Sequence, residues 1–243
     1  AAGVMSDELG KLAQHAASQF DRLGWKNLCS AHRGPPCLNP TIDKMSHKAA
    51  RFLHHLQRRG ASVRMRTAPW SLEQLDTAMQ YGSHASVAGE FSEFLREEMA
   101  DMVKKGYWLV LPYTKVRTLS RLRLSPAGVV PQRERRPRTI IDYTWSGVNA
   151  EALQLAPKEA MQFGRALQRV LQKVHQADYR HGPVHSMKLD LADGFYRVGI
   201  NAMDVPALGV ALPYPPSTVN SPWWPSPLHC QWVGLNHHPI SLP

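Results

Sequence analysis

The segment Ser125–Tyr143 constrains the fold most, because its sequence has the pattern of a β-hairpin. An apolar stretch leads into a charged tip, and a second strand is expected to begin near Arg138. The tip carries Arg133, Arg135 and Arg136, and each guanidinium group can hold two phosphate oxygens. This hairpin suits a nucleoside triphosphate or a nucleic-acid backbone, although an ordinary exposed hairpin has the same composition.

Apolar residues at helical spacing predict helices on both sides of the hairpin. One helix is expected from about Ser83 to Lys105, where Gly106 ends it, and Tyr107–Leu111 then has the composition of a buried strand. A second helix is expected from about Pro157 to Gln176. Its apolar side chains are expected to form a buried face: Met161, Leu167, Val170, Leu171 and Val174.

The N-terminal part predicts short helices and a loop. A helix is expected around Leu12–Leu23, followed by a breaker-rich loop at Cys29–Cys37. Cys29, His32 and Cys37 hint at a zinc knuckle, but no fourth ligand has suitable local spacing, which favours the plain loop. A basic helix is then expected from Ser46 to Arg59, with Gly60 as its end. Its basic side chains could contact phosphate or form a solvated face: His54, His55, Arg58 and Arg59.

The charge of the chain indicates a polyanionic partner. The 243 residues carry a formal net charge of +10, and a surplus of Lys and Arg binds nucleic acid by releasing its counterions. A basic surface that only keeps the protein in solution is the alternative. Three scattered cysteines are too few for a disulfide framework, and no apolar run reaches membrane-spanning length. We therefore expect an intracellular protein, cytoplasmic or nuclear, without a membrane partner; no protein partner is indicated.

The segment His185–Leu191 contains the strongest catalytic candidate. Apolar and polar residues alternate in it, so a strand would bury Met187, Leu189 and Leu191 and project Asp190 from the opposite face. A carboxylate at the end of a central strand is what a magnesium-dependent phosphoryl transferase requires, because Mg²⁺ takes oxygen ligands. An aspartate that only caps a turn or a helix is the alternative.

Two stretches resemble motifs of retrotransposon reverse transcriptases. Lys188–Ile200 is similar to polymerase motif A, in which a Leu-Asp pair is followed five residues later by an aromatic residue. Arg138–Tyr143, continued by Gly147–Asn149, resembles the preceding fingers motif of that family. The resemblance covers roughly residues 85–213, and the turn at Lys104–Tyr107 also fits the entry into the fingers.

The resemblance implies a role for each matching position. Asp190 would be the catalytic, metal-binding carboxylate for Mg²⁺ or Mn²⁺, with the Leu191 carbonyl as a second oxygen. Arg138 would hold the incoming deoxynucleoside triphosphate, and Arg133, Arg135 or Arg136 would replace the family's fingers lysine, which has no clear match. The sugar pocket would be formed by Asp193, Gly194 and the steric-gate ring of Phe195.

The rest of the family pattern is missing. The motif with two adjacent aspartates should follow, yet no acidic residue occurs after Asp204. Instead the tail is rich in proline and tryptophan and lacks an apolar period. One hypothesis is a frameshift between about Pro213 and Trp223. Codons can be chosen for Cys230–Pro239 that, read in another frame, encode Pro-Met-Gly-Trp-Val-Glu-Ser-Pro-Pro. That peptide is close to the family's next motif. A genuine Pro/Trp-rich tail is the alternative.

Together these observations predict an α+β protein with a partial right-hand polymerase fingers and palm. We expect a helical and looped N-terminal extension at 1–82, fingers and partial palm at 83–213, and an irregular tail at 214–243. The expected function is that of a fragment of an RNA-directed DNA polymerase. Its partners would be an RNA or DNA template-primer and deoxynucleoside triphosphates. The alternative is a non-catalytic, basic nucleic-acid-binding module.

Overall fold

The computed structural model describes residues 2–33, 40–44, 46, 50–84, 87, 91–153, 166–187, 198–212 and 232–236. The chain forms two compact units, residues 1–152 with 195–243, and residues 153–194. The predicted α+β class is confirmed. None of the described helices combines the length and the apolar character needed to cross a membrane.

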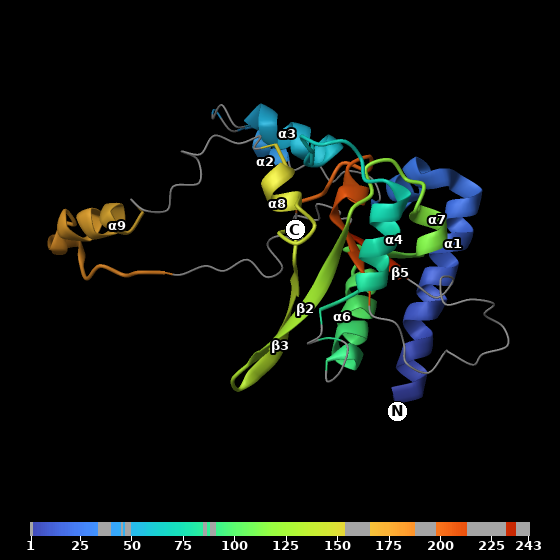
Figure 1. Cartoon of the computed structure of the whole chain (residues 1–243). Coiled ribbons are helices and arrows are strands. Elements are labelled where there is room, and N and C mark those ends of the chain that lie inside the picture. Colours follow the sequence, from blue (N-terminus) through green and yellow to red (C-terminus); the bar gives the residue numbers. More distant parts are fainter. Residues whose placement is uncertain are drawn as a thin grey trace. The chain divides into compact units, whose positions relative to one another are not determined.

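The larger unit contains most of the described elements (Figure 1). Its α-helices are α1 (Ala2–Arg33), α2 (Pro40–Asp43), α3 (Ala50–Arg59), α4 (Leu72–Tyr81), α6 (Ser92–Lys104), α7 (Tyr113–Val116) and α8 (Val148–Glu151), and η4 (Val205–Leu208) is a 3₁₀ helix. Its strands are β1 (Trp108–Pro112), β2 (Leu124–Gln132), β3 (Arg135–Ile141), β4 (Gly209–Ala211) and β5 (Trp232–Asn236).

The described strands form one five-stranded sheet in the order β1-β5-β4-β2-β3. Strands β2 and β4 run parallel, and the other neighbouring pairs are antiparallel. The parallel pair approaches closely because position 209 is glycine: a Cβ there would lie 2.6 Å from the carbonyl oxygen of Arg123. The hairpin at β2 and β3 and the strand at β1 were predicted from the sequence, and both are confirmed.

Helices cover both faces of the sheet, and alternate residues of β1 show this directly. Leu109 and Leu111 pack into a cluster with α4, whereas Trp108 and Val110 pack into a second cluster with α6. A strand buried on both faces reads as a continuous apolar run, as Trp-Leu-Val-Leu does. Helix α1 contributes side chains to both clusters and contacts β1 and α6.

Several N-terminal predictions need correction. The expected helix at Leu12–Leu23 is part of the longer α1, which continues through the predicted loop as far as Arg33, with a non-helical residue at Gly24. The helix continues because Leu28 and Cys29 are buried, so packing overrides the local breakers. Residues 34–39, including Cys37, lie outside the described part of the chain.

Two other helices end where the sequence predicts. Helix α3 stops at Arg59, before Gly60, whose φ is 77°. Helix α6 begins at Ser92 and ends at Lys104, two residues before Gly106, whose φ is 72°. Glycine supports such left-handed backbone without a Cβ clash, which is why it marks both ends.

The tail prediction is wrong for five residues. Trp232–Asn236 form β5, which pairs with both β1 and β4, and Val233 is buried. The sequence pattern missed this strand because no apolar period surrounds it. The remainder of the tail lies outside the described residues.

The smaller unit contains α9 (Ala166–His175) and the 3₁₀ helix η2 (Tyr179–His181). The predicted buried face is not formed by its described residues, since Leu167, Val170 and Leu171 are exposed. Met187, which the alternation predicted to be buried, is also exposed. The physical reason is size, because a segment this short cannot enclose a core of its own.

Candidate nucleotide and nucleic-acid interface

The β2–β3 hairpin positions the predicted arginines. Arg133 and Glu134 connect the strands, and Glu134 adopts a left-handed φ of 57°. Strand β3 begins at Arg135, earlier than the predicted start near Arg138, because a register shift lets Arg135 pair with Gln132. The shift leaves an extra residue on β3, as in a β-bulge.

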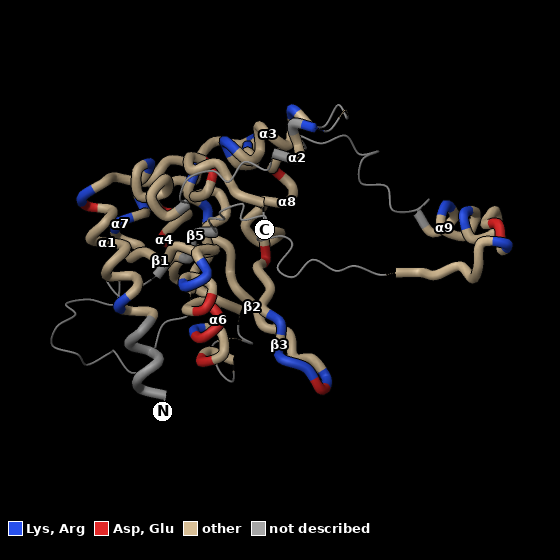
Figure 2. The backbone as a smooth tube through the Cα atoms, turned by 180° about the vertical axis from the view of Figure 1, so that it is seen from behind, with Lys and Arg blue, Asp and Glu red and all other residues tan. Residues whose placement is uncertain are grey.

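Three of the four predicted arginines are free to meet a ligand. Arg133, Arg135 and Arg138 are exposed, and no ion pair between described residues uses them. Figure 2 shows the basic residues following one another along β3. A row of unpaired guanidinium groups can bind successive phosphates.

Arg136 has a different environment. Its Nη2 atom lies 2.7 Å from Oε2 of Glu98, and its guanidinium carbon lies 5.2 Å from the ring centre of Phe94. Both partners belong to α6, so Arg136 ties the hairpin to that helix. The prediction that Arg136 binds nucleic acid stays untested, but its charge is already partly balanced.

One face of the hairpin combines apolar side chains with Arg138. Val130 pairs with Arg138 and Gly128 pairs with Ile140, and cross-strand partners lie on the same face. Val130 and Ile140 are exposed by 45% and 42%, respectively, whereas residues of the opposite face, such as Val129, are buried. This face can pack against a base or sugar while Arg138 holds a phosphate.

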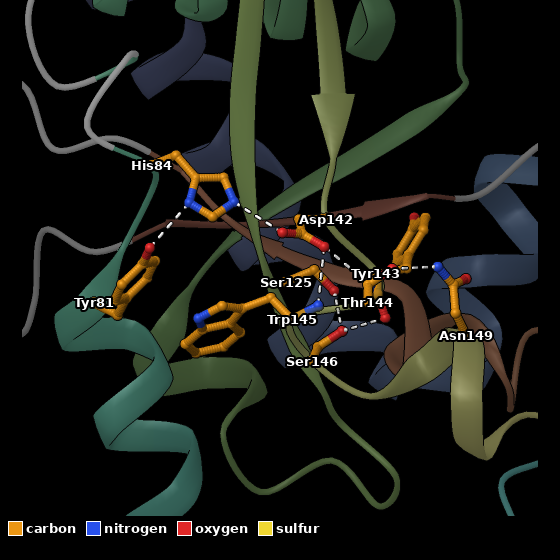
Figure 3. Close-up of polar contacts among 9 residues, drawn as sticks. All are labelled: Tyr81, His84, Ser125, Asp142, Tyr143, Thr144, Trp145, Ser146 and Asn149. Atoms are coloured by element: carbon orange, nitrogen blue, oxygen red, sulfur yellow. Dashed lines mark hydrogen bonds and ion pairs between the residues drawn. The ribbon is translucent and has the colours of Figure 1, made fainter.

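A polar cluster supports the hairpin at its base (Figure 3). Oδ1 of Asp142 accepts the backbone N–H groups of Thr144 and Trp145 at 3.0 and 2.9 Å, and Oδ2 lies 3.1 Å from Nε2 of His84. The pKa of Asp142 is lowered, chiefly by the N–H of Trp145 and further by His84 and Thr144. The hydroxyl of Tyr81 lies 2.9 Å from Nδ1 of His84. Asp142 therefore shapes the turn after β3.

Asn149 lies on α8, is the last residue of the segment predicted to be a fingers motif, and is hydrogen-bonded to the same turn. Its Nδ2 donates to Oγ1 of Thr144 at 2.9 Å, and the hydroxyls of Ser125 and Ser146 lie 2.7 Å apart. Gly147 permits the turn with a φ of 73°. The turn at Gly147 and the hydrogen bond from Asn149 to Thr144 thus explain the spacing between Tyr143 and Asn149.

A groove of about 330 Å³ lies beside this turn. Two aromatic rings, Trp70 and Trp145, line it together with polar and small side chains of α4: Glu73, Gln74, Thr77 and Ala78. The Trp145 ring is also stacked on Tyr81, with ring centres 4.8 Å apart. Aromatic walls beside hydrogen-bonding groups suit a flat ring such as a base. Sequence analysis missed this groove, because its two tryptophans are 75 positions apart.

The predicted motif A residues lie outside the described part of the chain. These are Asp190, Leu191, Asp193, Gly194 and Phe195. Among the described residues, no group of three or more His, Cys, Asp or Glu side chains is arranged to hold a metal ion. Cys29 is buried inside α1, and burial lowers the pKa of the neighbouring His32.

Removing the Asp142 carboxylate is expected to destabilise the turn. Asp142→Ala should lower the free energy of unfolding by about 1 kcal/mol, since two backbone donors lose their acceptor, whereas Asp142→Asn keeps an acceptor oxygen and should lose less. The pKa of Asp142 is lower in the folded state than its ordinary value of 3.8. The ionised carboxylate therefore stabilises the fold at pH values above 3.8, and this stabilisation is lost as the pH falls through the folded-state pKa. Urea unfolding from neutral to acid pH measures this: the wild-type–Ala difference should decrease toward the Asn–Ala difference, because protonated Asp142 keeps a neutral acceptor oxygen, and a wild-type–Ala difference that does not change with pH would contradict it.

Comparison of this chain with protein-family models, curated proteins and solved structures finds no significant match.

Proposed function

We propose that the chain is a fragment of a retrotransposon-type reverse transcriptase, whose parent enzyme carries out two-metal nucleotidyl transfer. The observation that supports this is the order of two motif resemblances, Arg138–Asn149 followed by Lys188–Ile200. The first motif starts on strand β3 and ends on α8, where Asn149 is hydrogen-bonded to the turn after β3. Arg138 is exposed beside Val130 and Ile140, as a residue that binds a nucleotide must be.

In the parent enzyme, Asp190 would bind Mg²⁺ or Mn²⁺ with the Leu191 carbonyl, and the metal would supply charge stabilisation for the transferred phosphate. Asp193, Gly194 and Phe195 would form the sugar pocket. The donor set does not fit a two-metal site, because residues 205–243 contain no acidic residue to match the family's two adjacent aspartates. We therefore propose that the chain itself is inactive.

A non-catalytic nucleic-acid-binding module is the second candidate. Three observations favour it: the unpaired arginines of the hairpin, the groove between Trp70 and Trp145, and the missing carboxylates. Binding of this kind needs phosphate contacts and stacking surfaces but no metal.

Primer extension tests the proposal. With an RNA template, a DNA primer, deoxynucleoside triphosphates and Mg²⁺ or Mn²⁺, we expect no extension by this chain. Nucleotide sequencing from the codon of Pro206 to beyond Pro243 should reveal Pro-Met-Gly-Trp and an aromatic-X-Asp-Asp motif in another frame. Their absence would remove the reverse-transcriptase proposal and favour the binding module. Extension that disappears in Asp190→Ala would instead overturn the inactivity and require metal ligands from elsewhere.

A further inference from the structure

One stretch of the chain, residues 44–72, combines many basic residues with no acidic ones. Between Lys44 and Leu72 the sequence has seven Lys or Arg residues and no Asp or Glu, so this segment carries a formal +7 of the net +10. The seven are Lys44, Lys48, Arg51, Arg58, Arg59, Arg64 and Arg66. Solvated surfaces usually mix both signs of charge, so this segregation indicates an anionic partner.

The structure leaves the arginines of this segment available. Arg51, Arg58 and Arg59 of α3 are exposed, as are Arg64 and Arg66 of the strand-like stretch that follows. None of the ion pairs formed between described residues involves any of the five. Arg51 and Arg58 are seven positions apart and so lie on the same side of the helix, whereas Arg59 is rotated by about 100° from Arg58.

The backbone that carries Arg64 and Arg66 is held in place at both ends. The N–H of Ala61 donates to the carbonyl of Gly199 at 2.7 Å, and the N–H of Arg66 donates to the carbonyl of Glu151 at 2.9 Å. Met65 also forms a bridge to Ala152. The two guanidinium groups therefore project from a fixed backbone, which lowers the entropy cost of binding.

The apolar side chains of α3 favour nucleic acid over a lipid surface. A membrane-bound helix needs a broad exposed apolar face. Among the large hydrophobic residues of α3, Phe52 is 60% exposed, while Leu53 and Leu56 are half-buried in the protein. One exposed ring is too little for insertion but can stack on a base.

We propose that α3 and the segment 60–66 form a second nucleic-acid-binding surface, which holds the phosphodiester backbone through Arg51, Arg58, Arg59, Arg64 and Arg66. Figure 2 shows basic positions on α3, apart from those of the β2–β3 hairpin. The surface needs neither a metal nor a nucleotide site, so it is independent of whether the chain polymerises DNA.

A charge-matched pair of variants tests the surface. The test variant combines Arg58→Gln, Arg59→Gln, Arg64→Gln and Arg66→Gln. The control combines Arg22→Gln, Lys26→Gln, Arg169→Gln and Lys173→Gln, which removes the same charge from exposed positions of α1 and α9. Binding is measured by fluorescence anisotropy of a labelled single-stranded oligonucleotide at several salt concentrations, and circular dichroism checks folding.

The test variant should bind more weakly, and the slope of log affinity against log salt should fall by about 0.7 for each lost contact. The control should retain the wild-type slope. Equal losses in both variants, or no loss in the test variant, would overturn the proposal. The proposal would also be overturned if the test variant lost binding to anionic lipid vesicles but kept its binding to the oligonucleotide. A second test variant, with the same four positions changed to Lys, should retain binding. Failed primer extension would leave these outcomes unchanged.

Discussion

Arg123→Met is expected to lower the free energy of unfolding by about 2–3 kcal/mol, because the buried guanidinium group donates charged hydrogen bonds that methionine cannot replace. Arg123 is 2% exposed and precedes β2. Its Nη1 donates to the carbonyl of Ser146 at 3.1 Å, and its Nη2 donates to Oγ1 of Thr67 and to Oε2 of Glu151.

The network joins segments that are far apart in sequence. The guanidinium carbon of Arg123 also lies 5.3 Å from the ring centre of Trp70, a wall of the groove. Methionine fills much of the same volume but donates no hydrogen bond, so the Ser146 carbonyl loses its Arg123 donor, and the Glu151 carboxylate keeps only the hydroxyl of Thr67. The turn after β3, α8 and the stretch before α4 should loosen together.

Arg117→Met is the matched control. Arg117 is about one-third exposed, its Nη2 lies 3.4 Å from Oδ2 of Asp76, and its guanidinium carbon lies 5.7 Å from the ring centre of Tyr113. A partly solvated pair of this kind contributes about 0–1 kcal/mol. Urea unfolding of both variants measures the difference. Similar losses at 117 and 123 would show that the Arg123 network does not join these segments as described.

Sequence predicted the elements whose signals are local. The hairpin at Ser125–Tyr143 and the helix end at Gly106 depend on neighbouring residues, and both are found close to their predicted places. The helix through Cys29 was missed because tertiary burial decides it. Strand β5 was missed for a related reason, since its partners lie more than a hundred positions earlier or on β4.

The candidate site also contains features that local sequence patterns predict and contacts that they do not. The exposure of Arg138 follows from strand alternation, which sequence can supply. The ion pair of Arg136 with Glu98 and the contact of Asp142 with His84 each join the hairpin to a different segment. No local pattern contains such contacts, so they could be found only from the three-dimensional arrangement.

Val233→Asp is expected to abolish cooperative folding of the larger unit. Val233 is fully buried, and it pairs with Leu111 of β1 and Ala211 of β4. A carboxylate at this position would lie without a partner in the apolar cluster that contains Leu111 and Ala211, which costs several kcal/mol, comparable to the whole stability of a domain. The expected result is loss of a single unfolding transition in circular dichroism.

Val130→Asp provides the comparison, because Val130 is also in a strand but is 45% exposed. Its effect should stay within about 0.5 kcal/mol. If Val233→Asp is equally mild, the tail is irregular, as its composition predicts, and the sheet ends at β4 with β1 detached. If Val233→Asp unfolds the unit, the tail completes the sheet between β1 and β4. A frameshift origin would then be compatible with a folded product, because a strand in this place requires only buried apolar side chains and backbone pairing.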